Sequence, residues 1–204
     1  MTAADIDCFD AIEATLKKAA AALERHRVSF LLGGSMAVWA RGGPESCNDL
    51  DLMVRQEDAD DALAALEEAG MRCERPPEGW LYKAWDGEVL VDLIFGPKGQ
   101  PIDDATFERS ERVSASGLEL RAMSLDDVLI TKLRALHEHY LDYDPLLQAA
   151  RAVRERIDWD RVRAATEDSP YARAFFTLVE GLHLVEPRAA PRPAEGRPRI
   201  RVAE

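Results

Sequence analysis

The chain has 204 residues, of which 47% are apolar, and it carries 26 basic against 38 acidic residues for a formal net charge of −12. The apolar content is enough for a packed core and excludes global disorder. The negative charge argues against broad, non-specific nucleic-acid binding. No apolar run approaches membrane-spanning length, so no membrane contact is expected. Cys8, Cys47 and Cys73 form no CxxC pair, and we expect reduced thiols in a cytoplasmic protein.

A long amphipathic helix is predicted from about Asp5 to Arg27, because apolar residues recur there at helical spacing. A short apolar strand follows from Val28 to Leu32 and breaks at Gly33-Gly34-Ser35. Glycine lets the backbone approach a ligand closely, and amides at a helix start favour anions. This turn therefore favours a phosphate cradle, although taken alone it fits a tight strand-to-helix connection equally well.

The next strand runs to Val54 and carries Asp49 and Asp51. Side chains alternate along a strand, so these two carboxylates share one face. Neighbouring carboxylates repel each other, and a hard divalent ion with oxygen ligands relieves that repulsion. Solvated acids on a half-exposed strand are the alternative. The glycine turn and the acid pair at this spacing together indicate a site for a metal-bound nucleoside triphosphate.

A third acid follows on a later strand. A helix is predicted from Gln56 to Gly70, and then a hairpin turns at Asp86-Gly87 between strands 80–85 and 88–95. On the return strand Asp92 is flanked on its own face by Leu90 and Ile94, which indicates a partly desolvated carboxylate rather than a surface acid. We therefore add Asp92 to the candidate site.

The run Gly33-Gly34-Ser35, the acids of Asp49-Leu50-Asp51-Leu52 and the later Asp92 together resemble the signature of the DNA polymerase beta-type nucleotidyltransferase superfamily, over roughly residues 28–95. Small bacterial members include antibiotic-modifying and toxin–antitoxin enzymes. The resemblance implies that the three acids hold two Mg²⁺ ions, or Mn²⁺, and that the glycine turn holds the triphosphate. Asp92 resembles the general base of the family. Cys47 and Asn48 depart from the Ser or Thr that often precedes the acid pair.

A second hairpin is predicted over residues 111–122, and helices follow from Ser124, an N-cap residue. Lys132 lies in the middle of the apolar stripe of the first of these helices, so it requires an anionic partner. That partner is either the triphosphate, as at a similar point in related nucleotidyltransferases, or a structural acid between domains. Arg41 is a further candidate for nucleotide binding. Asp144, before Pro145, is a helix-start signal.

Three regions are expected: a catalytic core over residues 1–122, a helical extension over 123–185 and a disordered Pro/Arg-rich tail over 186–204. The predicted fold is α/β, with a small mixed sheet flanked by helices and a C-terminal helical bundle. The expected reaction moves a nucleoside monophosphate from an NTP such as ATP to an acceptor hydroxyl and releases pyrophosphate. The acceptor is a small molecule, tRNA or protein, and a toxin-type member would have an antitoxin partner. A catalytically idle nucleotide-binding or partner-binding module is the alternative.

Overall fold

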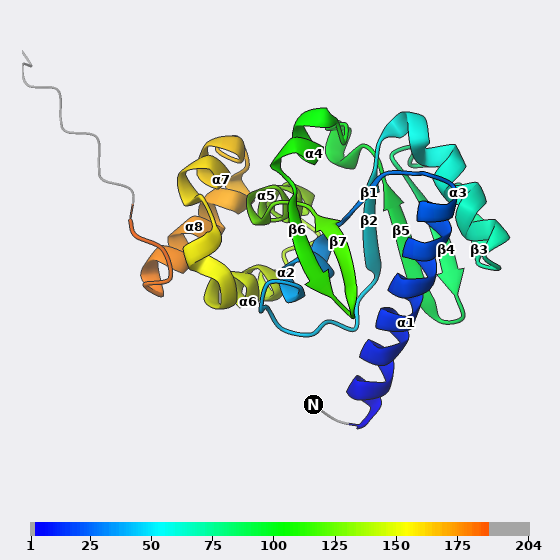
Figure 1. The fold of residues 1–204 in the computed structure, drawn as a ribbon. Coiled ribbons are helices and arrows are strands. Elements are labelled where there is room, and N and C mark those ends of the chain that lie inside the picture. The colour runs from blue at the N-terminus through cyan, green and yellow to red at the C-terminus, as the bar shows by residue number, and fades with distance from the viewer. Residues whose placement is uncertain (1–2, 188–204) are drawn as a thin grey trace, which may run out of the picture.

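The computed structural model describes residues 3–187. The strands before residue 123 form one mixed β-sheet (Figure 1). Within that range its strands form a 7-stranded sheet in the order β3-β4-β5-β2-β1-β7-β6. β2 is parallel to β5 and β1 is parallel to β7, while the other neighbouring strands are antiparallel. The strands are β1 (Phe30–Leu32), β2 (Leu50–Val54), β3 (Arg72–Glu74), β4 (Leu81–Asp86), β5 (Val89–Ile94), β6 (Glu111–Ala115) and β7 (Leu118–Ala122).

Helices α1 (Ala3–Arg25) and α3 (Ala59–Glu68) pack against each other and against strands β4 and β5. Most apolar side chains of β1, β2 and β5 are buried, as expected for a sheet covered by helices. Asp86 at the end of β4 accepts hydrogen bonds from Thr15 and Lys18 of α1, which ties this hairpin to the helix. Because side chains alternate, Asp51 and Asp92 point to the opposite side of the same strands from their buried neighbours Leu52 and Leu93.

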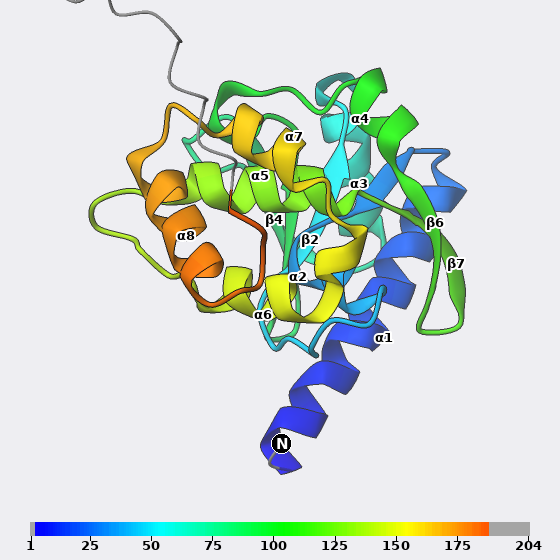
Figure 2. The same cartoon turned by 90° about the vertical axis from the view of Figure 1, so that its left-hand side faces the viewer.

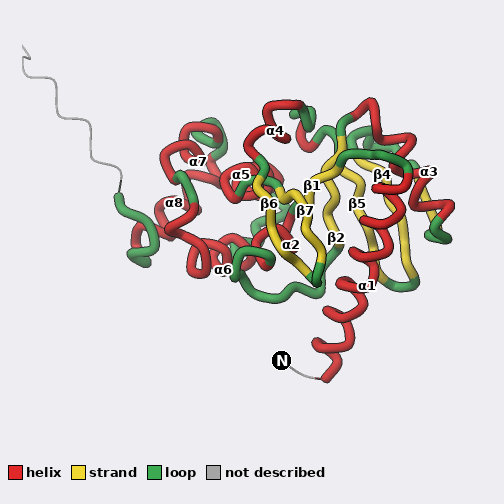
Figure 3. Tube along the Cα trace, viewed as in Figure 1, coloured by secondary structure: helices red, strands yellow, loops and turns green. Residues whose placement is uncertain are grey.

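After β7 the described chain is helical. It comprises α5 (Leu125–Ala135), α6 (Asp144–Val153), α7 (Trp159–Ala165) and α8 (Pro170–Gly181). Figures 1 and 2 show these helices gathered to one side of the sheet, and Figure 3 shows the strands and this helical part as separate regions. The short helix α2 (Gly34–Trp39) contacts both α5 and α6. The turn that begins α2 therefore lies where the sheet meets the helical part.

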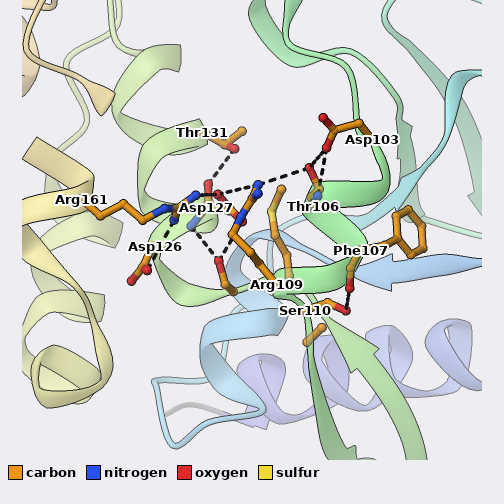
Figure 4. Close-up of polar contacts among 12 residues, drawn as sticks. Asp103, Thr106, Phe107, Arg109, Ser110, Asp126, Asp127, Thr131 and Arg161 are labelled. Carbon is orange, nitrogen blue, oxygen red and sulfur yellow. Dashed lines mark hydrogen bonds and ion pairs between the residues drawn. The ribbon is translucent and has the colours of Figure 1, made fainter. Parts of the chain in front are cut away.

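A polar network anchors α5 (Figure 4). The carboxylate of Asp127 accepts hydrogen bonds from Arg109 of α4 (Asp104–Arg109), at 2.8 Å from Nε, and from Arg161 of α7. The hydroxyl of Ser124, the N-cap of α5, donates to the same carboxylate at 2.8 Å. One carboxylate thus joins α4 on the sheet side to α7 in the helical part, and fixes the start of the helix that carries Lys132.

The predicted fold class is confirmed, and both predicted hairpins are present at the expected turns. Two elements were not predicted, β3 and α4, and the helix expected over 56–70 divides into a 3-10 turn (Gln56–Asp58) and α3. The predicted disordered tail over 186–204 lies, from residue 188 onward, outside the described residues. No helix in residues 3–187 combines the length and apolarity that a membrane crossing requires.

The prediction of reduced thiols is wrong for two of the three cysteines. Cys8 in α1 and Cys47 in the loop before β2 form a disulfide, with 5.8 Å between their Cα atoms. The two residues are 39 positions apart, and the fold brings the start of α1 against the loop that leads into the acid strand. Cys73 is a free thiol.

Candidate active site

The turn between β1 and α2 lies directly against the acid strand. The N–H of Gly33 donates to the carbonyl oxygen of Asp51 at 2.9 Å. Gly34 has a φ of +51°, and a Cβ built there would lie 1.7 Å from Oδ2 of Asp51. A Cβ at Gly33 would lie 2.4 Å from Cε of Met53. Gly34 is therefore needed for close contact with β2, and its left-handed backbone favours glycine as well, whereas a side chain at Gly33 would first displace the flexible end of Met53.

Asp49, Asp51 and Asp92 form a group that we call the acid row, in which Asp51 and Asp92 lie side by side on adjacent strands. Asp51 of β2 is the parallel neighbour of Asp92 of β5, and Lys83 of β4 is directly opposite Asp92 on its other side. Nζ of Lys83 lies 2.9 Å from Oδ1 of Asp92, whose side chain is 14% exposed. The partly desolvated position predicted for Asp92 is thus confirmed. Asp49 immediately precedes β2 and is exposed.

The electrostatics of the row follow from its surplus of negative charge. The pKa of Asp51 is raised to about 6: burial is the largest cause, the charges of Asp92 and Asp49 add to it, and the charges of Lys132 and Lys83 oppose it. Desolvation and the charge of Asp92 raise the pKa of Asp49, against a lowering by Lys83. These shifts show that the acids are close enough to destabilise one another's ionised forms.

Lys132 joins the turn to the acids. Its Nζ lies 3.4 Å from the hydroxyl oxygen of Ser35, and its charge acts on Asp51. Ser35 and Lys132 also line a pocket of about 200 Å³ between α2, α6 and the loop before β2. The other residues that line it are Val38, Pro44, Glu45, Ser46, Cys47, Asn48, Asp144, Pro145, Gln148 and Ala149. The contact of Lys132 is with a neutral hydroxyl, so its predicted anionic partner, the triphosphate or a structural acid, stays a prediction.

The structure places Arg41 apart from this group. Its side chain is buried, and it donates to Glu111 at 3.0 Å and to the carbonyl oxygens of Ala37, Ala122 and Met123. These bonds tie the end of α2 to β6 and to the end of β7, so Arg41 has a structural role and we leave it out of the proposed nucleotide site.

Residues 11–185 match the family described as "Uncharacterised nucleotidyltransferase". The chain belongs to this nucleotidyltransferase family. The match spans the sheet, the acid row and most of the helical part, so it covers both regions of this nucleotidyltransferase. The predicted membership of the nucleotidyltransferases is confirmed. Among curated proteins, no sequence matches the chain significantly.

Solved structures share the fold of this nucleotidyltransferase at low sequence identity. The solution structure of the antibiotic-resistance factor ANT(2'')-Ia matches with a TM-score of 0.60 and 16% identity, over 84% of this chain and 96% of that chain. A crystal structure of ANT(2'')-Ia in complex with adenylyl-2''-tobramycin matches with a TM-score of 0.51 and 19% identity, over the same shares of the two chains. Because the match covers 84% of this chain, the likeness extends beyond the sheet into the helical part.

The donor set of the nucleotidyltransferase fits a hard divalent ion. Asp49, Asp51 and Asp92 offer only oxygen ligands, which Mg²⁺ and Mn²⁺ prefer. Across residues 3–187, however, no three His, Cys, Asp or Glu side chains are gathered closely enough to enclose an ion. One oxygen of Asp92 is paired with Lys83 instead.

Lys83 is the residue of this row that the sequence analysis did not identify. The signal was present, because the hairpin turn at Asp86-Gly87 fixes the register of β4 against β5 and places Lys83 directly opposite Asp92. Asp144 is the first residue of α6 rather than its cap, and accepts a hydrogen bond from the side chain of Gln148. The N–H of Asp144 is itself capped by the carboxylate of Asp142, at 3.0 Å.

Proposed function

We propose that this nucleotidyltransferase moves a nucleoside monophosphate from an NTP to an acceptor hydroxyl and releases pyrophosphate, in a reaction that requires a divalent ion. The observation that carries the proposal is the contact between Asp51 and Gly34, which makes the glycine turn and the acid row one continuous site. A phosphate cradle on one side and carboxylates on the other match the two ends of a metal-bound triphosphate.

In this proposal each residue of the site has a separate role. The turn Gly33-Gly34-Ser35 and the ammonium of Lys132 would hold the anionic oxygens of the triphosphate. Asp49, Asp51 and Asp92 would hold two Mg²⁺ ions, or Mn²⁺, which neutralise charge on the attacking and leaving oxygens when bound. Asp92 would accept the proton of the acceptor hydroxyl as its oxygen attacks the α-phosphorus and pyrophosphate leaves.

The acceptor we propose is a hydroxyl-bearing small molecule. The shared fold with ANT(2'')-Ia, whose complex contains adenylyl-2''-tobramycin, supports this choice. The net charge of −12 and the carboxylates of Glu45 and Asp144 in the pocket wall disfavour a polyanionic acceptor. A tRNA or protein acceptor, with an antitoxin as partner of the enzyme, is the alternative that the experiment below separates.

The test is incubation with each α-labelled NTP and Mg²⁺, separately with a panel of aminoglycosides and related hydroxyl compounds, with total tRNA and with a protein extract. We expect label on a small molecule, lost with a chelator. Asp49→Asn should reduce transfer to background because it removes a carboxylate of the site. Asp104→Asn, whose side chain is 83% exposed outside the site, is the matched control and should behave as wild type. Label on no acceptor, or full transfer by Asp49→Asn, would refute the proposal.

A further inference from the structure

Lys83 lies inside the acid row, yet the proposed chemistry gives it no role. It is on β4 with its side chain 28% exposed, and its Nζ is 2.9 Å from Oδ1 of Asp92. The pairing is built into the backbone, because β4 and β5 form an antiparallel hairpin in which residues 83 and 92 are direct partners. Side chains directly opposite each other on one sheet face are close enough to interact. An ammonium is therefore fixed beside the candidate base.

The charge of Lys83 lies near the whole row and not only beside its direct partner. Asp51 is the parallel neighbour of Asp92 on β2, and Asp49 lies two residues before Asp51. Lys83 and Lys132, near Ser35, together set two positive charges against three carboxylates. The row is thus left close to neutral, with one negative charge in surplus when all three acids are ionised. A divalent ion alone gains less from this arrangement than from three free carboxylates.

We propose that Lys83 is a positioning residue for Asp92: its ammonium holds the carboxylate in place and weakens the binding of a divalent ion until a nucleotide is present. This inference rests on the proposed function. An NTP brings negative charge that offsets Lys83 and Lys132, so ion and nucleotide bind together rather than in sequence. Lys83 then keeps Asp92 oriented toward the acceptor hydroxyl, while Asp49 and Asp51 supply the remaining oxygen ligands.

A positioning role and a purely structural role of Lys83 predict different changes in metal affinity when Lys83 is replaced. An outer partner that accepts a hydrogen bond from a metal ligand strengthens metal binding, and its loss weakens it. Lys83 is a cation that competes with the ion for an oxygen of Asp92, so its loss should strengthen metal binding. A pair that only stabilises the sheet would change the melting temperature and leave metal affinity as it is.

The experiment compares wild type with Lys83→Met, Lys83→Arg and the control Lys18→Met. Lys18 pairs with Asp86 of the same strand at 2.6 Å, so its replacement removes the same charge and the same kind of ion pair outside the acid row. Mn²⁺ binding without nucleotide is measured from the electron paramagnetic resonance signal of the free ion. We expect Lys83→Met to bind Mn²⁺ about tenfold more tightly than Lys18→Met.

Kinetics on the same variants give the second readout. Lys83→Met should lower kcat about 10- to 100-fold with little change in the KM for the NTP, because Asp92 loses its orientation while the phosphate cradle is untouched. Lys83→Arg keeps the charge and should recover most of the rate. Equal Mn²⁺ binding by Lys83→Met and Lys18→Met, including no binding by either, overturns the inference, as does a wild-type kcat in Lys83→Met. An inactive wild type would refute the proposed function instead, and the Mn²⁺ titration would still decide the role of Lys83.

Discussion

Two groups of aspartates in this molecule, Asp126 with Asp127 and the acid row, have different charge balances. Asp127 accepts hydrogen bonds from the guanidinium groups of Arg109 and Arg161 (Figure 4), and also from the hydroxyl of Ser124. Burial alone would raise its pKa, but these hydrogen bonds lower it below the ordinary value. The acid row has three carboxylates against two ammonium groups, and burial raises the pKa of Asp51 to about 6. Asp126 and Asp127 are matched by two guanidinium groups, whereas the acid row keeps one carboxylate in excess.

The difference separates an anchor from a binding site. Both oxygens of Asp127 already accept hydrogen bonds from fixed donors, so this carboxylate has no free acceptor site for a ligand. It instead joins α4, α5 and α7. Carboxylates that repel one another keep unmet binding capacity, which a cation can satisfy. The acid row is therefore less favourable for the stability of the ligand-free protein, as is common where a site awaits its ligand.

The largest expected effect is on turnover. Asp92→Asn should lower the transfer rate by about two to four orders of magnitude, because the general base is lost. NTP·Mg²⁺ affinity should largely persist through Asp49, Asp51 and the glycine turn. Rate, NTP affinity and melting temperature are measured on this one variant. A lower melting temperature with normal turnover would make Asp92 an anchor like Asp127, and wild-type values throughout would make it a surface acid.

The second largest expected effect is on the free energy of unfolding of the metal-free protein. The folded pKa of Asp51, about 6, lies above its ordinary value of 3.8, so the folded protein binds this proton more tightly than the unfolded chain. The resulting stabilisation is complete below about pH 4 and is lost as the pH rises through 6. Asn cannot ionise, so Asp51→Asn should be more stable than wild type above pH 6, by at most about 3 kcal/mol.

Urea unfolding in a chelator at pH 4 and pH 7.5 measures this. We expect the two proteins to differ little at the lower pH and to separate at the higher one. An Asp51→Asn variant that is less stable than wild type at pH 7.5 would show that Asp51 is satisfied in the folded protein, and the contrast with Asp127 would disappear.

The same substitution at the anchor should have the opposite sign. Asp127→Asn leaves Arg109 and Arg161 facing a neutral amide, and should cost about 2 kcal/mol of unfolding free energy at pH 7. Because the folded pKa of Asp127 is lowered, its contribution is present above about pH 4 and is lost as the pH falls through the folded value. Asp126→Asn is the milder control, because it weakens the 3.4 Å pair with Arg161 while its amide oxygen can still accept from the N–H of Asp158. A neutral or stabilising Asp127→Asn would contradict the anchor role.

The smallest effect concerns Lys132, which lies between the two groups on α5. Lys132→Met should weaken NTP binding about tenfold, because one charge partner of the triphosphate is lost while methionine suits the apolar helix face. Isothermal titration calorimetry measures the affinity, and Lys17→Met, at an exposed position of α1, controls for the change in net charge. If the NTP affinity is unchanged, Lys132 belongs with the structural contacts.

Local patterns predicted most of the site. Alternation put Asp49 and Asp51 on one strand face and singled out Asp92 on a later strand, and the hairpin turn at Asp86-Gly87 was visible in the sequence. The pairing of β2 with β5, which makes Asp51 and Asp92 neighbours, came only from the structure. The unpredicted strand β3 is short and polar, and its structure depends on pairing with β4. The unpredicted helix α4 had a signal that was not used, since Asp103 caps it by accepting from the N–H of Thr106.

The errors were about contacts between distant parts of the chain. Arg41 follows the glycine turn closely in sequence, but its partners Glu111 and Ala122 are 70 and 81 positions away. Cys8 and Cys47 are likewise joined only because α1 and the loop before β2 meet in the fold. Neither pairing leaves a periodic pattern in a single sequence, so residue type and spacing could not reveal them.

Gly34 also offers a criterion for comparing members of the family. A side chain at this position would need the space that Oδ2 of Asp51 fills, since a Cβ there would come within 1.7 Å of that oxygen. A relative with any larger residue at this position cannot keep an aspartate at position 51 in the same place, even if both acids are present in its sequence. In a large set of sequences, the residue aligned with Gly34 can therefore distinguish intact sites from sites that retain the acid motif but have lost its geometry.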